Sequence, residues 1–367
     1  MIRRVRDGAV LMLAVALGAI ALGCGGDDGG SSGSADSDVR RGTGPASKRF
    51  LDRYVAADGR VRRIDEGDDT VGEGQAYGML IAAAAGDEGR FDDIWQWTKD
   101  NIRRKDELIS FLWRDGRVRD PEAASDADVD AARALLAAGC RFKRSDLREE
   151  ALTLARAIRE KETASFKGKP VLSAGPWANE DPITLNPSYF SPATFAALGA
   201  ATGDGRWGSL SESARSVTDA LMQPSTPLPP DWARVEGGEL APSGPPGQPD
   251  ASPKFSFDAV RTLVRLAEDP DAAGRRIAAR AWPVFDGRKP AEILVDHDLS
   301  GQPIGGPRHP VVLVAAAGAA DAAGQSGDRD RLLNAAESLD KGAPTYYGAA
   351  WVALGRIMLT TDALSSC

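Results

Sequence analysis

The 367-residue chain is predicted to be all-α, with six helical hairpins closed into a ring, an (α/α)6 toroid. Segments rich in Ala, Leu, Arg and Glu with apolar residues at helical spacing recur along the sequence, whereas stretches that alternate apolar and polar residues are few. Polar, aromatic and glycine-rich clusters stand at the starts of the second, fourth, sixth, eighth and twelfth helical segments. In an alternating double ring every second helix is an inner one and points the same way, so these clusters would meet at one rim.

Gly, Pro and Asp separate the helical segments, as in G-D-E-G-R at 86–90 and G-D-G-R at 203–206. The predicted helices are 45–56, 72–86, 91–104, 126–142, 145–161, 188–203, 206–222, 256–269, 271–285, 309–323, 327–340 and 344–360. Twelve helices make six hairpins, and no second domain is evident. A superhelical repeat array is the main alternative, but the sequence shows no repeat of the period that such arrays require.

The beginning of the chain predicts an export signal over residues 1–23. Three arginines occur among the first six residues, and an uncharged apolar run follows at 9–22. This run is too short to span a bilayer comfortably as a permanent helix. The sequence after Cys24, G-G-D-D-G-G-S-S-G-S, has nothing to bury, so 24–44 is expected to be a flexible tether before a folded domain at 45–367.

Small residues, then a cysteine and a polar tether, resemble a bacterial lipoprotein signal, in which Cys24 would carry the lipid after cleavage. Ala21 stands where that pattern usually has Leu, and plain secretion is the alternative. We therefore expect an exported protein whose link to a membrane is a lipid at Cys24. Cys140 and Cys367 could pair in an oxidising compartment, but the preferred interpretation is a small buried Cys140 and a frayed end at Cys367.

The composition favours chemistry based on carboxylates. Two histidines, His297 and His309, are too few for multi-histidine zinc sites, and three cysteines are too few for a disulfide-built scaffold. The formal charge of −8 argues against a nucleic-acid partner, which would require a basic stripe. His297 lies in D-H-D and could bind a metal with the two Asp, although an ordinary polar loop explains the triplet better. Phosphate loops and nucleophile elbows are absent from the sequence, so we expect no cofactor and no metal.

One segment interrupts the helical pattern. Residues 223–254 contain nine prolines and several glycines. A loop of this length is usually either functional or disordered. Asp231 and Trp232 lie in it, so part of the segment could cover a site, and a solvated insertion is the equal alternative.

The first candidate site is D-T-V-G-E-G-Q-A-Y-G-M at 69–79. Glu73 begins a helix between Gly72 and Gly74, which both cost helix stability but let backbone or a ligand approach the carboxylate closely. The segment is not a dinucleotide fingerprint, because the spacing differs and no strand precedes it. A capping glutamate is the structural explanation, and the two glycines and Tyr77 make a functional explanation equally good.

A second cluster, A-S-D-A-D-V-D at 124–130, begins another helix. Ser125 can cap this helix, and Asp residues in its first turn favour the helix dipole, which is the plain structural explanation. A calcium loop also starts D-x-D-x-D, but the glycine and the closing glutamate that it needs are missing. Asp126 and Asp130 share a helix face while Asp128 points elsewhere, so one of the first two could face a cavity.

A third cluster, F-S-F-D-A-V-R at 255–261, places Asp258 and Arg261 three residues apart on one helix face. A surface ion pair of little energetic value is the structural alternative. The aromatic and polar residues directly before the helix favour a functional site instead.

Together these clusters resemble glycoside hydrolase family 8, the bacterial endoglucanase family that also contains chitosanases, xylanases and lichenases. The first cluster is similar to the family's S-E-G-Q-G-Y-G-M segment, with Gly72 in place of Ser and Ala76 in place of Gly. Residues 124–142 are similar to its long signature around A-T-D-A-D, with Ala131 where the signature expects Ile or Met.

Two further family blocks are similar to N-P-S-Y-F-S-P-A at 186–193 and F-D-A-V-R at 257–261, and the four blocks follow one another in the family's order. The resemblance covers about 50–360 and implies the six-hairpin toroid that the helix pattern predicts independently.

By this resemblance Glu73 corresponds to the family's proton donor, and Asp258 to the general base of the subgroup whose base lies at the start of the eighth helix. Asp126 corresponds to the signature Asp that contacts the sugar at the cleavage point. Tyr189 and Arg261 correspond to residues around the same subsite.

The family inverts the anomeric centre. The acid protonates the leaving oxygen, while the ionised base stands about 6.5–9.5 Å away and leaves room for a water molecule. Arg261, one turn after Asp258, would help to hold the base charged. Phe257 departs from the Tyr that often precedes the base.

Aromatic side chains are candidates for stacking on sugar rings, although at least half of them are expected in the core. They are Trp95, Trp97, Trp113, Trp177, Tyr189, Trp232, Trp282, Tyr346 and Tyr347. Of the aromatic residues, we expect Tyr77, Trp113, Tyr189 and Tyr347 to contact substrate.

The sequence thus predicts an exported, inverting, endo-acting glycosidase that cleaves a cellulose-like β-1,4-glucan and works as a monomer. Chitosan, xylan and mixed-linkage glucan are alternative substrates for the same fold. A competing class is a polysaccharide-binding or assembly protein that keeps the toroid but does not turn over, and the presence of all three carboxylates disfavours it.

Overall fold

The computed structural model describes residues 35–365, and the side chains from residue 44 on. Within this range six helices form a closed inner ring, in which each helix packs on the next and the last packs on the first. In ring order these are α2 (Gly72–Ala85), α4 (Ser125–Arg141), α6 (Pro192–Thr202), α8 (Ala259–Ala267), α11 (Pro310–Ala322) and α13 (Tyr346–Thr360).

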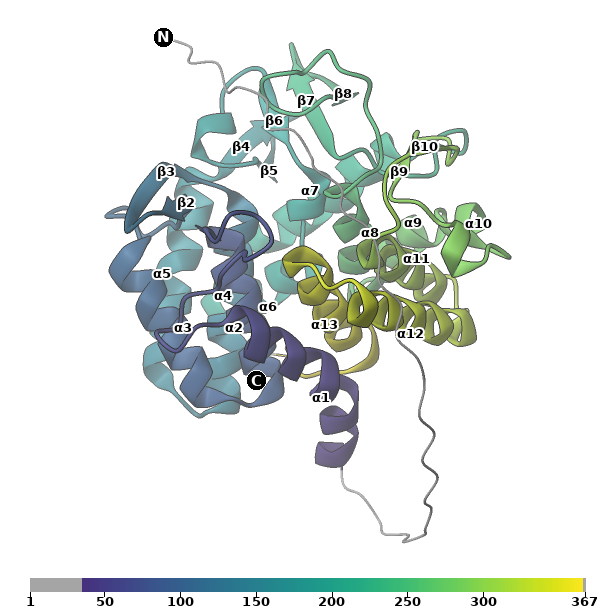
Figure 1. The fold of residues 1–367 in the computed structure, drawn as a ribbon. Coiled ribbons are helices and arrows are strands. Elements are labelled where there is room, and N and C mark those ends of the chain that lie inside the picture. Colours follow the sequence, from purple (N-terminus) through teal and green to yellow (C-terminus); the bar gives the residue numbers. More distant parts are fainter. Residues whose placement is uncertain (1–34, 366–367) are drawn as a thin grey trace, which may run out of the picture.

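An outer layer of helices covers this ring (Figure 1). The outer helices are α1 (Ala35–Tyr54), α3 (Glu88–Asn101), α5 (Ser145–Lys161), α7 (Arg206–Leu221), α9 (Ala272–Ala279) with the short α10 (Trp282–Phe285), and α12 (Ser326–Gly342). The first helix, α1, packs on α13 and α2, so the two ends of the folded chain close the ring. The predicted toroid of six helical hairpins is confirmed.

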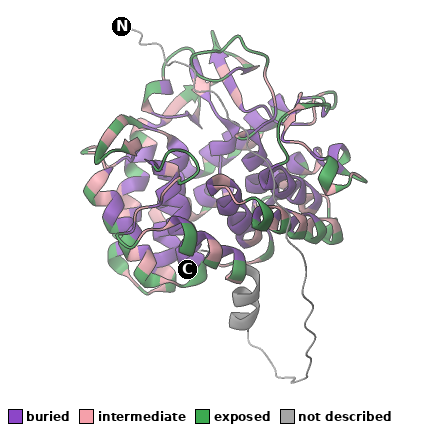
Figure 2. Cartoon of the chain, in the orientation of Figure 1, coloured by how far each residue is buried: buried purple, intermediate pink, exposed green. Residues whose placement is uncertain are grey.

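Inner and outer helices differ in the way the sequence distributes apolar residues. The inner helix α11 has the sequence P-V-V-L-V-A-A-A-G-A-A and is buried along Pro310–Ala320. The outer helix α5 buries one face only, through Leu147, Ala151, Leu154, Ala155, Ala157 and Ile158. A helix that is apolar all round must be surrounded by protein, whereas an amphipathic helix covers a core with one face. Figure 2 shows the buried residues gathered in the interior and the exposed ones at the periphery.

Helix boundaries agree with the prediction to within a few residues at most positions. The sixth helix begins at Pro192 rather than 188, after a 3-10 turn η2 (Pro187–Tyr189), because each proline favours a start and not an interior position. The predicted ninth helix, 271–285, divides into α9 and α10 just before Pro283, whose ring prevents a continuous helix.

The predicted tether 24–44 is partly wrong, because α1 begins at Ala35. The sequence A-D-S-D-V-R-R at this point has Asp and Arg four residues apart, a spacing that supports a helix. The predicted signal at 1–23 and the predicted lipidation site Cys24 lie outside the described residues.

Short antiparallel strands, which the sequence did not predict, lie on one side of the ring, the upper side in Figure 1. Strands of two to seven residues contain too few alternations to be recognised. They are β1 (Thr70–Val71), β2 (Ser110–Arg114) and β3 (Arg117–Ala123) in one sheet, β4 (Thr163–Phe166) with β5 (Lys169–Leu172), β6 (Ile183–Leu185) with β7 (Trp232–Glu236) and β8 (Glu239–Ser243), and β9 (Asp296–His297) with β10 (Pro303–Gly305).

The Pro-rich segment 223–254 is therefore folded. Its centre forms the hairpin β7–β8, and β7 pairs with β6 in the register Leu185 to Ala233. Asp231, directly before β7, is buried. The segment is consequently not simply a solvated insertion, since residues 228–231 belong to the protein interior, although 236–239 and 245–252 are exposed.

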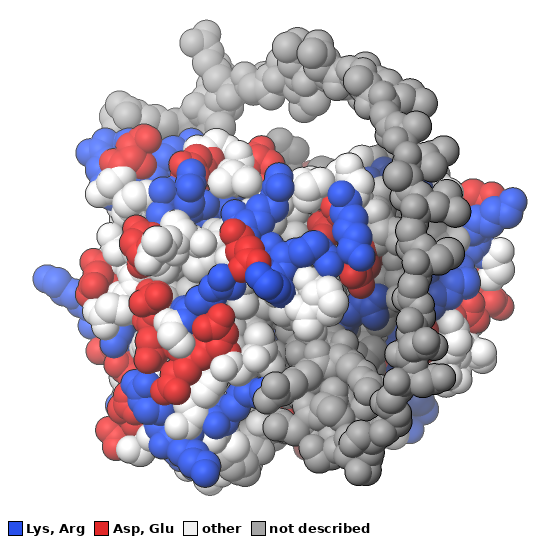
Figure 3. Space-filling model, turned by 60° about the horizontal axis from the view of Figure 1, so that its bottom comes forward, with Lys and Arg blue, Asp and Glu red and all other residues white. Residues whose placement is uncertain are grey.

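The surface carries many ion pairs, and acidic and basic side chains are intermingled on the face shown in Figure 3. Along the part of the chain that the structure describes, none of the helices combines the length and apolarity needed to cross a membrane. Cys140 is half-buried and disulfide-bonded. The interpretation of Cys140 as a simple buried apolar residue is therefore wrong, since sequence spacing does not reveal which cysteines a fold brings together. Cys367 lies outside the described residues.

Candidate active site

The N-terminal ends of three inner helices meet at one buried arginine. Arg261, on α8, is 1% exposed. Its Nη1 donates to Oδ2 of Asp126 at 2.8 Å, to Oη of Tyr77 at 3.0 Å and to Oε2 of Glu73 at 3.1 Å. Its Nη2 donates to Oδ1 of Asp258 at 2.6 Å. The structure thus places four of the predicted site residues around the guanidinium group of a fifth, Arg261, and the predicted meeting of helix starts at one rim is confirmed for these helices.

The glycines beside Glu73 allow the neighbouring elements to approach closely. A Cβ atom on Gly74 would lie 2.7 Å from Oη of Tyr346, and one on Gly72 would lie 3.0 Å from the carbonyl oxygen of Ser110. Both distances are shorter than ordinary packing allows, so Tyr346 and Ser110 can pack this closely against the start of α2 because these two positions lack side chains.

The three aspartates at the start of α4 point in the predicted directions. Asp126 contacts the central guanidinium group, and Asp130, one turn deeper, forms two hydrogen bonds of 2.7 and 2.9 Å with the buried Arg265. Oδ1 of Asp128 faces away from both and accepts the backbone N–H of Ile109 at 2.9 Å. Of the three, Asp126 is the one that belongs to the candidate site.

The electrostatics of the cluster keep a proton in it near neutral pH. Burial raises the pKa of Asp126 to about 8, with further contributions from the negative charges of Glu73 and Asp130 and an opposing one from Arg261. Burial also raises the pKa of Tyr77 and Tyr189, so both phenols stay protonated and can donate hydrogen bonds. Tyr77 uses its hydroxyl to donate to Oε2 of Glu73 at 3.3 Å.

A cavity of about 430 Å³ opens beside this cluster. Its lining residues are Asp65, Glu66, Glu73, Phe257, Asp258, Arg261, His309, Thr345 and Tyr347. Phe257, His309 and Tyr347 form an aromatic group, in which the rings of Phe257 and His309 are 5.1 Å apart and Oη of Tyr347 donates to the carbonyl oxygen of Phe257 at 2.7 Å. Burial lowers the pKa of His309 to about 4, so its ring is neutral around pH 7.

Sequence reasoning missed four residues of this cavity: Asp65, Glu66, His309 and Thr345. His309 and Thr345 stand directly before the inner helices α11 and α13, and this is the same signal that pointed to the other clusters. Asp65 accepts the backbone N–H of Tyr346, a contact between distant parts of the chain that no local pattern indicates.

Three other predicted aromatic residues do not line this cavity. The ring of Tyr189 faces the Arg261 guanidinium at 5.3 Å, and Trp232 packs edge-on against Tyr189 at 6.1 Å. Trp177 is 44% exposed, and its Nε1 donates to the carbonyl oxygen of Ala123, just before α4. Tyr189 therefore contacts the cluster directly and Trp232 supports its ring, while the exposed Trp177 offers a face for stacking near the start of α4.

Trp113 lies one strand away from the cluster, paired with Thr70 in the sheet that leads into α2. The guanidinium group of Arg60 covers its ring at 4.5 Å, and Trp97 packs edge-on against it at 5.3 Å. Five of the nine aromatic candidates are buried, as expected: Trp95, Trp97, Tyr189, Trp282 and Tyr346.

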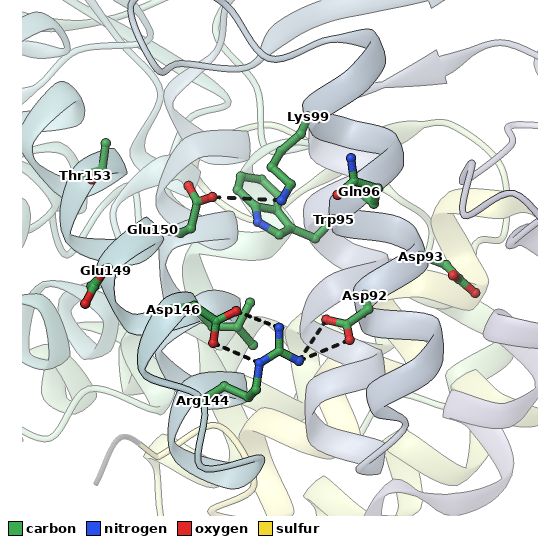
Figure 4. Close-up of a pocket in the computed structure, with 11 residues that line it drawn as sticks. Asp92, Asp93, Trp95, Gln96, Lys99, Arg144, Asp146, Glu149, Glu150 and Thr153 are labelled. Carbon is green, nitrogen blue, oxygen red and sulfur yellow. Dashed lines mark hydrogen bonds and ion pairs between the residues drawn. The ribbon is translucent and has the colours of Figure 1, made fainter.

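A larger cavity, of about 660 Å³, lies between the outer helices α3 and α5 (Figure 4). It contains none of the residues expected to act on or contact the substrate, and of the aromatic stacking candidates Trp95 lines it. Most of its charged groups pair with one another, since Arg144 pairs with Asp92 and Asp146 and Lys99 pairs with Glu150. This groove is a network of surface ion pairs and not a second candidate site.

The D-H-D triplet does not gather its side chains around one point. His297 is buried between Phe255 and Phe285, while Asp296 accepts a hydrogen bond from Ser256. Among the residues that the structure describes, no group of three or more His, Cys, Asp or Glu side chains has the arrangement of a metal site.

Comparison with known proteins identifies relatives of this chain. The model of the family described as glycosyl hydrolases family 8 matches residues 35–286. A probable endoglucanase of Novacetimonas hansenii is 33% identical over 218 residues, which are 58% of this chain and 63% of that protein. An endoglucanase of Cellulomonas uda is 30% identical over 239 residues, or 62% of this chain and 64% of that protein. The chain thus spans just under two thirds of the length of these curated relatives.

Solved structures show the same architecture. The endo-β-1,4-glucanase of Acetobacter xylinum superimposes with a TM-score of 0.72 at 27% identity, and the match covers 89% of this chain and 98% of that one. The family model spans more than half of the sequence and includes Glu73, Asp126 and Asp258. The chain therefore belongs to glycosyl hydrolases family 8.

Proposed function

We propose that this protein is an endo-acting, inverting glycoside hydrolase that cleaves a β-1,4-linked glucan. The observation that carries the proposal is the set of three carboxylates, each from a different inner helix, held by Arg261 at the edge of a cavity. Family membership supports hydrolysis of a glycosidic bond, and the similarity to proteins named endoglucanase supports the substrate class.

Glu73 is the proposed general acid. It lines the cavity, and its Oε2 is held by Tyr77 and Arg261. Asp126 shares the same guanidinium nitrogen, and its raised pKa keeps a proton beside Glu73 around neutral pH. In the reaction Glu73 would give its proton to the glycosidic oxygen as the bond to the anomeric carbon breaks.

Asp258 is the proposed general base. Its side chain is about one third exposed, lines the cavity, and pairs with the opposite nitrogen of the same guanidinium group. The proposed acid and base contact different terminal nitrogens of Arg261, at 3.1 and 2.6 Å, and an inverting mechanism would place a water molecule between the two carboxylates. Asp258 would take a proton from this water as its oxygen attacks the anomeric carbon from the face opposite to the leaving group.

Release of reducing ends from carboxymethylcellulose, chitosan, xylan and mixed-linkage glucan tests this proposal. We expect wild-type activity on at least one β-1,4-linked substrate, a fall in polymer viscosity that precedes most of the sugar release, and a product that first appears as the α-anomer by NMR. Glu73→Gln and Asp258→Asn should each remove turnover. If activity survives Glu73→Gln on every substrate, the assignment of the acid is wrong.

The same panel separates the substrates and the competing class. Preference for chitosan, xylan or mixed-linkage glucan would replace the glucan assignment without changing the assigned residues. Tight binding of oligosaccharides by the wild type, with no cleavage on any substrate, would show a polysaccharide-binding protein instead.

We also propose export and anchoring through a lipid at Cys24. The support is the sequence of residues 1–24, with its basic start, short apolar run and cysteine followed by a polar tether. The wild type should partition into detergent, and Cys24→Ala should move it to the aqueous phase, where size-exclusion chromatography should show a monomer. A wild type that stays in the aqueous phase would contradict the anchor.

A further inference from the structure

The proposed general base, Asp258, occupies a helix position at which an Asp side chain usually caps the helix. Asp258 is the N-cap residue of α8, and an Asp at this position commonly accepts the free N–H groups of the first helical turn with its own side chain. Here the Asp258 side chain makes no capping hydrogen bond. It instead reaches Arg261 at 2.6 Å and lines the cavity.

A residue from a distant segment caps the helix instead. Oδ1 of Asp231 accepts the backbone N–H of Ser256 at 2.9 Å and that of Ala259 at 2.8 Å. These two residues flank Phe257 and Asp258 in the sequence, so one carboxylate oxygen holds both ends of the short backbone stretch that carries the base. Asp231 is 9% exposed, which means that little water competes for these hydrogen bonds.

We propose that Asp231 is a positioning residue for the reaction: it caps α8 in place of Asp258 and thereby leaves the Asp258 carboxylate free to face the cavity. This inference rests on the proposed function, because it takes Asp258 as the base. Asp231 itself does not touch the reacting atoms.

The backbone around Asp231 is fixed well enough for this task. Its N–H donates to the carbonyl oxygen of Lys254 at 2.8 Å, and two prolines precede it in the sequence P-P-D-W. The next residue, Trp232, packs against Tyr189 and begins β7. The Pro-rich segment therefore supports two sides of the site at once, the base through Asp231 and the Tyr189 ring through Trp232.

Steady-state kinetics of Asp231→Ala and Asp231→Asn on the best substrate of the wild type test the proposal. Asp231→Ala frees the start of α8, and we expect kcat to fall about 10- to 100-fold because the base loses its alignment. KM should change less than about twofold, since sugar-binding side chains keep their places. Asp231→Asn should restore kcat to within about threefold of the wild type, because its amide oxygen can accept the same two N–H groups.

Asp271→Ala is the matched control. Asp271 is the N-cap residue of the neighbouring outer helix α9, where its side chain accepts the N–H of Ala273 at 2.8 Å. Removing this cap should lower the melting temperature to a similar degree as Asp231→Ala and leave kcat unchanged. If Asp231→Ala does not fold, Asp231→Glu tests the same contact, since it keeps the carboxylate but moves its oxygens by one methylene group, and kcat should again fall.

The possible results are distinct. The inference is overturned if Asp231→Ala keeps the wild-type kcat per folded molecule, or if its loss of kcat/KM comes from a higher KM. It is also overturned if Asp231→Asn has as low a kcat as Asp231→Ala. An inactive wild type, or a wild type whose activity is unaffected by Asp258→Asn, would instead overturn the proposed function.

Discussion

One side chain, Arg261, holds the candidate site together. Its planar guanidinium group presents several N–H donors in fixed directions, so it can serve Glu73, Asp126 and Asp258 at the same time. A lysine would keep the positive charge but offers a single ammonium group, which cannot reach three carboxylates in this geometry. The shape of the cation, and not its charge alone, is therefore what the site requires.

Arg261→Lys should lower kcat/KM by at least about 100-fold, since the proposed acid Glu73, the proposed base Asp258 and Asp126 lose their common partner. Arg265→Lys is a close control, because Arg265 lies one turn further along α8 and forms a buried two-bond pair with Asp130 away from the acid and the base. This variant should lose stability, measured by thermal unfolding, but keep kcat. Equal kinetic losses in both variants would mean that Arg261 acts only through stability.

A second residue-scale feature is the buried acid pair Asp128 and Glu162. Burial raises the pKa of both carboxyl groups, and the charge of Asp128 adds to the effect on Glu162. Glu162 has no ion-pair partner among the residues that the structure describes. The folded protein therefore binds protons that the unfolded chain has already released, so the pair costs stability increasingly as the pH rises above about 4.

Glu162→Gln should remove most of this dependence. At pH 8 we expect the variant to be more stable than the wild type by about 1–3 kcal/mol, whereas the two should be equal near pH 4, where the unfolded chain also becomes protonated. Urea unfolding at both pH values measures the difference. Glu149→Gln, at an exposed position of the helix α5 that Glu162 directly follows, should change neither value. A variant that is less stable than the wild type at pH 8 would contradict the prediction.

At the scale of elements, the inner helices pack closely because small residues face their neighbours. A Cβ atom on Gly355 of α13 would lie 2.3 Å from Cγ1 of Val314 on α11. Gly355→Ala should therefore destabilise the protein by about 1–3 kcal/mol through overpacking, although alanine is the better helix former. Chemical denaturation should show this loss.

In the double variant Gly355→Ala with Val314→Ala, the smaller side chain at position 314 leaves room for the new methyl group. The double variant should therefore be more stable than Gly355→Ala alone. Gly208→Ala on the outer helix α7 is the comparison, since a Cβ atom there meets nothing within 4 Å. That substitution should be neutral or stabilising by up to about 1 kcal/mol. If Gly355→Ala were as stable as Gly208→Ala, α11 and α13 would have to be further apart at this contact than they are in the structure.

The helices were predictable from sequence because each carries a strong local pattern. The composition of Ala-rich α11 and the spacing of apolar residues in amphipathic α5 indicate a helix without any tertiary information. The short strands were not predictable, since hairpins such as β7–β8 are stabilised by pairing with β6 more than by their own sequence.

Some residues of the candidate site were likewise predictable from local sequence, and others were not. Glu73, Asp126 and Asp258 follow from motifs at helix starts, so local sequence was sufficient to find them. Asp65 and Asp231 act through hydrogen bonds to backbone that is distant in the sequence, at Tyr346 and Ser256 respectively. Contacts of this kind depend on the tertiary fold, and a single sequence does not display them.

At the scale of the whole molecule, the ring closes where the first helix meets the last. Phe50 of α1 is fully buried, and its ring lies 5.4 Å from Tyr54 and 6.3 Å from Tyr346 at the start of α13. Tyr346 in turn fills the space beside Gly74, next to the proposed acid. This closure therefore connects the N-terminal helix to the rim that carries the site.

Because a closed ring gives every inner helix two inner neighbours, weakening the closure should affect all of them. Phe50→Ala should lower the free energy of unfolding by about 3–5 kcal/mol in one cooperative transition. Hydrogen exchange should quicken in α2 and α13 as well as in α1, whereas Phe111→Ala, at a side chain that is 41% exposed, should change little. Faster exchange confined to α1 would show that this helix frays independently, and that the remaining helices hold the rim without it.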